Sequence, residues 1–288
     1  MIAELTQLLI NGLLAGALLA VPAIGFTAIY AVLRFPNFAV ASHATIGAYA
    51  GFVANAWWGW PAAAALLAAF LVAGVAGVVT DELVLRRLRV AGPMTVAIAS
   101  VALTIVLENV LRFGFGNELR GYDLPVLRDW RFGGLRIGPQ QVENAAAGAV
   151  AMAALFVFLG FTRTGKMMRA VADNPVLAGL KGIDGARVAR LVNFVGMGLA
   201  GFGGMLIGLD TSIDPLTGFR VMLSVFAAAV VGGLGSIPGA VVGALVIGVG
   251  EEFSLVVLDP SYRTAVGFVA ILLVLSFRPR GLLGERAY

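Results

Sequence analysis

Long apolar runs are the feature of this sequence that most restricts how the chain can fold. They occupy residues 5–33, 38–60, 61–85, 94–113, 142–161, 188–209, 219–231, 238–258 and 262–277. Inside a bilayer the backbone must satisfy its own hydrogen bonds, and about 20 residues of helix cross the hydrocarbon core. Only 12% of the residues are charged, about half the fraction in a soluble domain. We therefore predict an all-α polytopic membrane protein with about nine transmembrane helices, between roughly eight and ten, in a single domain over residues 1–288.

The connections between the runs differ in charge, and this difference predicts the orientation. Residues 162–190 hold six Lys or Arg against two Asp, and residues 86–89 hold three Arg. Residues 114–141 are nearly balanced, with four Arg against three acidic residues. Because basic loops stay in the cytoplasm, we expect 162–190 inside and 114–141 outside, with the N-terminus out and the C-terminus in. The tail adds cytoplasmic charge through Arg278, Arg280 and Arg286.

Composition excludes several classes of function. The sequence has no Cys and one His, so it can form neither a disulfide nor a multi-histidine zinc site. Its net charge of +4 lies in the loops, and we expect the lipid bilayer as a partner but no nucleic acid. Residues 160–167 resemble a phosphate loop but end in Met167, and residues 196–201 spell a dinucleotide fingerprint inside an apolar run. Both lack the strand that these motifs require, so we predict no enzyme, no metal site and no cofactor in this chain.

Small residues recur at helical spacing within the apolar runs. Four glycine pairs are each separated by four residues, namely Gly12/Gly16, Gly47/Gly51, Gly204/Gly208 and Gly239/Gly243. Such pairs lie on one face of a helix and permit close backbone approach. The sequence therefore predicts tight helix-on-helix packing, without saying which helices meet.

The basic connection 162–190 contains the signals of two short helices. Thr164 can cap a helix over residues 165–172, and Asn174 can cap a second helix that begins with Pro175, continues to Lys181 and ends at Gly182. The second is too short to stand alone in water. The connection is therefore either a solvated basic loop or a helix held against the membrane or in a groove of a partner.

The sequence of this connection resembles a known family. Residues 165–175, Gly-Lys-Met-Met-Arg-Ala-Val-Ala-Asp-Asn-Pro, are similar to the coupling loop of permease subunits of the branched-chain amino acid class of ABC importers. Three other stretches agree in the same order: 25–39 ending Leu-Arg-Phe-Pro-Asn-Phe-Ala, 231–240 with Gly-Gly-Leu-Gly-Ser-Ile-Pro-Gly, and 278–284 with Arg-Pro-Arg-Gly-Leu-Leu-Gly. After Phe38 and Ala39 the family commonly continues with His-Gly and an acidic residue, whereas this chain continues Val-Ala-Ser before His43. Selectivity for leucine, isoleucine and valine is therefore not assured.

The resemblance implies a multi-pass protein of the bacterial inner membrane that works with other subunits. These are two cytoplasmic ATPase subunits that use ATP and Mg, a second identical or homologous permease, and a periplasmic substrate-binding protein. Residues 162–190, hereafter the coupling segment, would seat in a cleft of the ATPase. The residues that the resemblance assigns to this contact are Gly165, Arg169, Asn174, Pro175, Ala178 and Gly182.

Polar residues inside the apolar runs are candidates for a substrate pathway. They are Thr27, Tyr30, His43, Thr45, Thr104, Glu108, Asn109 and Asn193. Glu108 either pairs with Arg112, four residues later on the same helix, or contacts the polar end of a substrate. His43 either packs with a local hydrogen bond or contacts substrate.

The sequence thus predicts the permease subunit of an ATP-driven importer for branched-chain or related amino acids or small polar solutes. One alternative is an ion-coupled secondary transporter, which would use the membrane carboxylates as a relay. The other is a passive channel for an amide such as urea.

Overall fold

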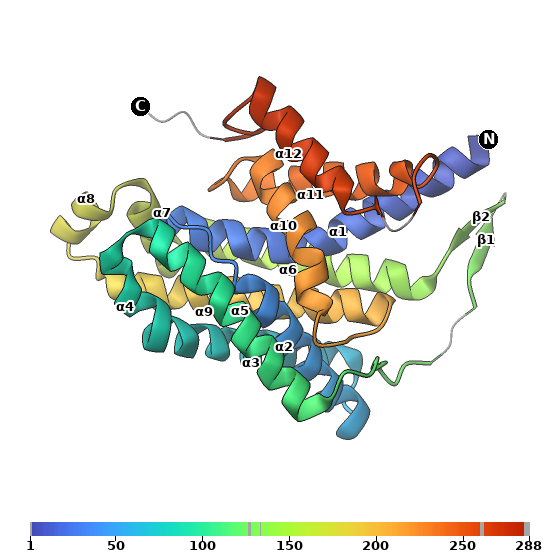
Figure 1. Cartoon of the computed structure of the whole chain (residues 1–288), viewed down its shortest axis with the longest axis horizontal. Helices are drawn as coiled ribbons and strands as arrows, with labels where there is room; N and C mark the ends of the chain where they lie inside the picture. Colours follow the sequence, from blue (N-terminus) through green and yellow to red (C-terminus); the bar gives the residue numbers. More distant parts are fainter. Residues whose placement is uncertain (1, 126–127, 133, 260–261, 285–288) are drawn as a thin grey trace.

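The computed structural model describes residues 2–125, 128–132, 134–259 and 262–284, and Arg286 lies outside these residues. Helices dominate (Figure 1). The long ones are α1 (Ile2–Leu33), α3 (Ala62–Thr80), α5 (Pro93–Phe115), α6 (Pro139–Phe161), α9 (Gly185–Asp210) and α11 (Ile237–Ser254). The shorter ones are α2 (Val40–Phe52), α4 (Arg86–Leu88), α7 (Arg163–Asp173), α8 (Pro175–Leu180), α10 (Thr217–Gly232) and α12 (Ala265–Phe277), with π-turns at Val53–Trp57 and Asp81–Leu85 and a 3-10 turn at Arg89–Ala91.

Each of the nine apolar runs contains a helix, but not all of these helices reach spanning length. In the described part of the chain, six helices are long and apolar enough to cross a membrane. The multi-pass helical fold is therefore confirmed, whereas nine spans and the orientation remain predictions. The helices α2, α10 and α12 are the short members, with 13, 16 and 13 residues.

One short hairpin lies outside the helices, which the sequence did not predict and which leaves the all-α fold class unchanged. Within residues 114–141 the strands β1 (Trp130–Phe132) and β2 (Leu135–Ile137) form an antiparallel hairpin. The side-chain amide of Gln7 donates to the Arg136 carbonyl and accepts from the Arg136 N–H, each at 2.8 Å. The hairpin is thereby attached to the first turns of α1.

Glycines set the spacing of the central helices, as the small-residue pattern predicts. The long helix α9 is largely buried and packs on α1, α2 and α3. A Cβ on Gly47 would lie 2.2 Å from the Gly201 Cα, and one on Gly204 would lie 2.1 Å from the Ala44 carbonyl oxygen. Such approaches leave no room for a side chain, so α2 and α9 pack backbone against backbone. The helix α1 meets α11 in the same way, through its own pair of glycines.

The connection between α1 and α2 is not helical, although it packs against the side of α5. The Phe38 N–H donates to the Ser100 hydroxyl at 3.0 Å, and the Thr104 hydroxyl donates to the Phe38 carbonyl at 3.2 Å. Ser100 stands about 10 Å along α5 from its first residue. Non-helical backbone at such depth is tolerated where protein satisfies it or where it borders a cavity. We call residues 34–39 the helix break.

Candidate functional site

The coupling segment begins where α6 ends, at a cap that differs from the predicted one. Thr162, not Thr164, has the extended N-cap conformation, and its hydroxyl accepts from the Gly165 N–H at 2.9 Å. The helix α7 therefore begins two residues before the predicted start. The prediction was wrong because two threonines compete here and the earlier one also closes α6, donating to the Phe158 carbonyl at 2.6 Å.

Gly165 allows α7 to pack closely against the end of α6. A Cβ at this position would lie 2.4 Å from the Phe158 carbonyl oxygen and 2.5 Å from the Leu159 Cα. Only glycine allows α7 to cross the end of α6 at this distance. The start of α7 therefore lies directly against the last turn of a long helix.

The second short helix, α8, has the predicted caps. The Asn174 side chain accepts from the Leu177 N–H at 2.9 Å, and Pro175 is the first helical residue. Gly182 follows the helix with φ +82°, in the left-handed region where glycine is favoured. The local sequence therefore determines where α8 starts and stops.

A small apolar cluster anchors the coupling segment to the bundle. Met168 and Val171 of α7 and Ala178 of α8 are buried together with residues of α1 and α9. In addition, the Arg34 guanidinium of the helix break donates to the Ala172 carbonyl. Through these contacts, the segment is connected to α1, α9 and the helix break at once.

The far side of α8 exposes apolar side chains that were not among the predicted contact residues. Val176 is 74% exposed, Leu177 53% and Leu180 80%. The helix projects beyond the rest of the bundle (Figure 1), and an exposed apolar tip of this kind marks a contact surface. The sequence signal is three large apolar residues within five positions of a connection that also carries six Lys or Arg.

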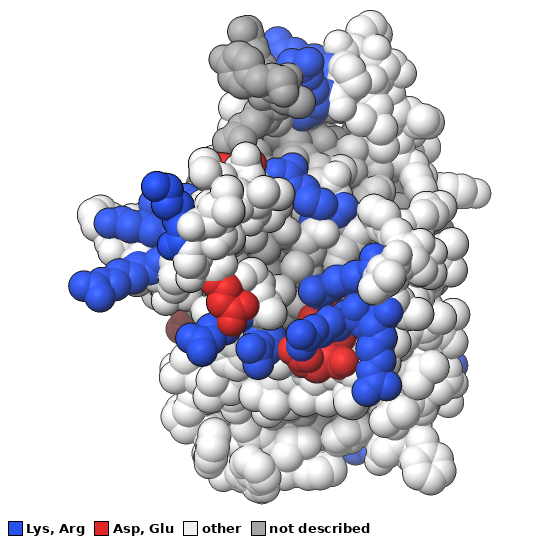
Figure 2. Space-filling model, turned by 90° about the vertical axis from the view of Figure 1, so that its left-hand side faces the viewer, with Lys and Arg blue, Asp and Glu red and all other residues white. Residues whose placement is uncertain are grey.

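Basic side chains surround this tip. Figure 2 shows that Lys and Arg predominate at the end of the molecule that carries α7 and α8. The exposed members on the coupling segment are Arg163, Lys166, Arg169, Lys181, Arg187 and Arg190. The face as a whole suits a partner with an acidic rim around an apolar cleft.

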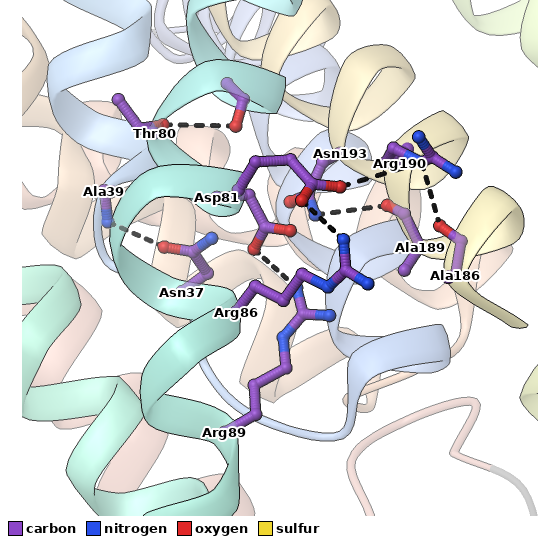
Figure 3. Close-up of polar contacts among 12 residues, drawn as sticks. Asn37, Ala39, Thr80, Asp81, Arg86, Arg89, Ala186, Ala189, Arg190 and Asn193 are labelled. Atoms are coloured by element: carbon purple, nitrogen blue, oxygen red, sulfur yellow. Dashed lines mark hydrogen bonds and ion pairs between the residues drawn. The ribbon is translucent and has the colours of Figure 1, made fainter.

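Two carboxylates on the π-turn after α3 face basic side chains from neighbouring elements (Figure 3). Asp81 is buried and pairs with Arg89 of the 3-10 turn at 2.5 Å. Glu82 pairs with Arg86 at 2.5 Å and reaches Arg190 of α9 at 3.7 Å. These pairs line a cavity of about 250 Å³ that residues of α7 and α8 also border. The cluster therefore joins the ends of α3 and α9 next to the coupling segment.

The first turn of α9 is capped by Asp184 in the coupling segment. Its carboxylate accepts from the N–H groups of Ala186 at 2.9 Å and Arg187 at 3.3 Å. These backbone hydrogen bonds, first the one from Arg187, lower the pKa of the Asp184 carboxyl from its usual value. The cap of α9 is therefore charged at neutral pH.

Both ring nitrogens of His43 lie within hydrogen-bond distance of groups inside the helix bundle. Its Nδ1 lies 2.7 Å from the Ala39 carbonyl oxygen and its Nε2 lies 3.1 Å from the Thr80 hydroxyl. With both ring nitrogens engaged and no exposed surface, the imidazole connects α2 to the end of α3. This geometry favours the packing interpretation.

The pathway candidates lie in several places. Thr27, His43, Thr45, Thr104, Glu108 and Asn193 are buried, Tyr30 is half-buried and Asn109 is exposed. Among the described residues, no side-chain hydrogen bond joins any two of these eight. An oxygen without a hydrogen-bond partner occurs on Thr27, Glu108 and Asn193. The described residues therefore show no direct hydrogen-bond network among the eight candidates, and their role in a pathway stays a prediction.

The pair of Glu108 with Arg112, one of the two roles considered for this carboxylate, is not made as a direct contact. Neither an ion pair nor a hydrogen bond joins them in the described part of the chain, and both Glu108 Oε1 and Arg112 Nε are buried without a partner. The i, i+4 spacing permits such a pair but does not impose it. Glu108 is itself buried, so the pathway interpretation of its carboxylate stays open.

Comparisons with known proteins connect this geometry to transport. Residues 8–276 match the family model described as the permease component of branched-chain amino acid transport systems. The chain is 31% identical to the high-affinity branched-chain amino acid transport system permease protein BraD of Pseudomonas aeruginosa, over 97% of this chain and 95% of BraD. It is 32% identical to LivH of Escherichia coli, which has the same description and the same coverage.

The fold comparison agrees over nearly the full length. The structure of PsaBC from Streptococcus pneumoniae in complex with Fab matches with a TM-score of 0.52 at 16% identity, covering 97% of each chain. At this identity the match supports the helical architecture alone.

Proposed function

Because this chain belongs to the family of permease components of branched-chain amino acid transport systems, a class of ABC importer subunits, we propose that it imports branched-chain or related amino acids or other small polar organic solutes. It is a multi-pass membrane protein, and ATP hydrolysis belongs to separate ATPase subunits. Its location is the inner membrane, in agreement with these relatives.

The observation that carries the proposal is the capped, apolar-tipped helix α8 on an anchored base. Val176, Leu177 and Leu180 are exposed, while Ala178 is buried against the bundle. Such a helix is suited to dock into an apolar cleft of an ATPase. Its base connects to α1, α9 and the helix break, so closure of the ATPases would move these elements together.

The remaining partners follow from the same assignment. We propose two ATPase subunits that use ATP and Mg, a second permease, and a binding protein on the outer side. The coupling segment then lies in the cytoplasm and residues 114–141 lie outside, within one permease domain. A cavity of about 1050 Å³ between the β-hairpin and the adjoining ends of α1, α9 and α11 is a suitable entrance, lined by polar groups such as Gln7, Asn11 and Gln141.

The test is uptake in proteoliposomes that contain this chain with its ATPases and its binding protein. Labelled leucine should accumulate with ATP and no ion gradient, and an ATPase variant that cannot hydrolyse ATP should abolish accumulation. Uptake by this chain alone, driven by a pH gradient, would overturn the proposal in favour of a secondary transporter. Downhill flux of urea without ATP would instead support a channel.

Substitutions within the coupling segment test its role. Ala178→Pro removes the hydrogen bond from the Ala178 N–H to the Asn174 carbonyl, which measures 3.0 Å, and distorts the helix. We expect the variant to insert in the membrane but to lose most ATP-driven uptake. Arg169→Glu should weaken the ATPase contact by reversing a charge. Normal coupling in both variants would contradict this assignment of the segment.

A further inference from the structure

A carboxylate and a guanidinium lie together where α10 begins. Asp214 is buried; its carboxylate accepts from the Thr217 hydroxyl at 3.0 Å and is paired with the Arg220 guanidinium. The Arg220 side chain is 61% exposed. Since an arginine has five N–H donors, this guanidinium retains donors for a further acceptor.

A buried tyrosine of α2 adds a third polar group. The Gly218 N–H donates to the Thr45 hydroxyl at 2.9 Å, which fixes the start of α10 against α2. One helical turn after Thr45, Tyr49 is 1% exposed, and its hydroxyl has no hydrogen-bond partner among the described residues. The Tyr49 ring packs in one buried cluster with Ile213, the residue before Asp214. A buried hydroxyl without a partner is costly, so its position beside the segment that carries Asp214 points to a ligand.

An apolar crevice starts beside the same turn. Its lining runs along α10 from Gly218 to Phe226, about 12 Å of helix rise. Phe38 of the helix break and Phe26 of α1 face Phe226, with ring centroids 5.6 and 5.8 Å from it. The crevice volume is about 10 Å³, room for about one water molecule. In this structure it is therefore closed, and its walls come from separate segments.

We propose that these two features form one binding site for a free amino acid with an apolar side chain. Arg220 receives the α-carboxylate, because a guanidinium matches a carboxylate in geometry and charge. Asp214 receives the α-ammonium, with the Tyr49 hydroxyl as a further hydrogen-bonding group. The side chain enters the crevice between Phe38 and Phe226 when these walls separate. This inference rests on the proposed transport function and identifies residues that select the substrate.

The helix break provides a route from this site to the coupling segment. Arg34, four residues before Phe38, donates to the Ala172 carbonyl of α7. The Phe38 backbone is in turn fixed to α5 through Ser100 and Thr104. A displacement of α7 therefore acts on the short segment whose phenylalanine ring closes the crevice.

The first experiment measures binding rather than transport. The purified permease–ATPase complex, without its binding protein, is heated with leucine, with 4-methylpentanoate, which lacks the ammonium, or with 3-methylbutylamine, which lacks the carboxylate. We expect leucine to raise the Tm of the complex and the two analogues to have little effect. An equal shift with either analogue, or no shift with leucine, would overturn the proposal.

Variants then assign the shift to the site. Arg220→Gln should abolish the leucine-dependent shift, and Tyr49→Phe, which removes only the hydroxyl, should reduce it. The matched control is Arg263→Gln, because Arg263 also pairs with buried carboxylates, those of Glu251 and Glu252, but lies elsewhere. It should keep the full shift. A full shift in Arg220→Gln, or its loss in Arg263→Gln, would contradict the assignment.

A third variant tests the crevice through selectivity in the ATP-driven uptake assay. Phe226→Ala enlarges the apolar space, so uptake of phenylalanine relative to leucine should rise about 10-fold. The control is Phe194→Ala, from the aromatic pair with Phe70 at 5.7 Å between α9 and α3, which should leave the ratio unchanged. Uptake with an unchanged ratio in Phe226→Ala would refute this site alone, whereas absence of ATP-driven uptake in the unmodified complex would refute the proposed function.

Discussion

Replacing one leucine at the tip of α8 gives the sharpest test of how this chain is driven. Leu180 is 80% exposed and lies at the end of α8, whose buried residue is Ala178. Leu180→Asp therefore changes the surface of the coupling segment while leaving its anchor intact. We expect the variant to fold and insert normally but to bind its ATPase weakly.

The size of the effect follows from the exposed area. Full burial of a leucine side chain stabilises a complex by about 1.5–3 kcal/mol. With 80% of Leu180 available for burial, docking into an apolar cleft gains about 2 kcal/mol from this side chain. The aspartate loses that gain and must also be desolvated. The dissociation constant of the permease–ATPase complex should therefore rise about 30-fold or more.

The assay is titration of purified ATPase onto the permease in nanodiscs, with transport-stimulated ATP hydrolysis as a second measurement. The matched control is Val90→Asp, because Val90 is 96% exposed on the 3-10 turn that follows α4 and lies outside α8. The control should bind normally. Equal affinities for Leu180→Asp and the unmodified chain would refute the docking role of the apolar tip.

Three further predictions concern stability and pH. Asp81→Asn should lower the free energy of unfolding by about 3 kcal/mol, because it leaves Arg89 without its charge partner. The double variant Asp81→Leu, Arg89→Met should recover most of this stability, as measured by thermal unfolding. Gly204→Ala should cost about 2 kcal/mol, because its Cβ would lie 2.1 Å from a carbonyl oxygen of α2, whereas Gly160→Ala, with open space around it, should not. The pKa of Asp184 is lower in the folded protein than its unfolded value of 3.8, so the cap stabilises α9 fully above pH 3.8 and is lost as the pH falls through the folded pKa. A spin label in the first turn of α9 should therefore gain mobility in acid. Asp184→Asn should remove this pH dependence.

The sequence predicts best what depends on short stretches of chain. The apolar runs located the helices because apolar length alone decides whether a segment is stable in a bilayer. Asn174, Pro175 and Gly182 indicated the ends of α8 because capping involves residues two or three positions apart. The choice between Thr162 and Thr164 failed because it depends on how α6 ends, which the capping pattern of α7 does not contain.

Contacts between distant segments could not be predicted from the sequence. The pair of Glu108 with Arg112 looked favourable on one helix, yet the direction of each side chain depends on what α5 packs against. Conversely, Asp214 and Tyr49 are far apart in the chain and come together only because α10 starts against α2. The composition of the segment before α10 gave no reason to select Asp214.

The close contact of α2 with α10 also limits how the crevice can open. A Cβ on Gly218 would lie 1.8 Å from the Ala41 carbonyl oxygen, so α10 cannot approach α2 any further at this level. Phe226 lies about 12 Å further along α10, where a small rotation about Gly218 produces a larger displacement. Separation of Phe226 from Phe38 is therefore easier as a tilt of α10 about Gly218 than as a translation of the whole helix. The far end of α10 packs closely on α11 through Gly232, so α11 has to follow the tilt. Such a motion would keep the charged pair at the start of α10 in place while it admits the side chain of a bound amino acid.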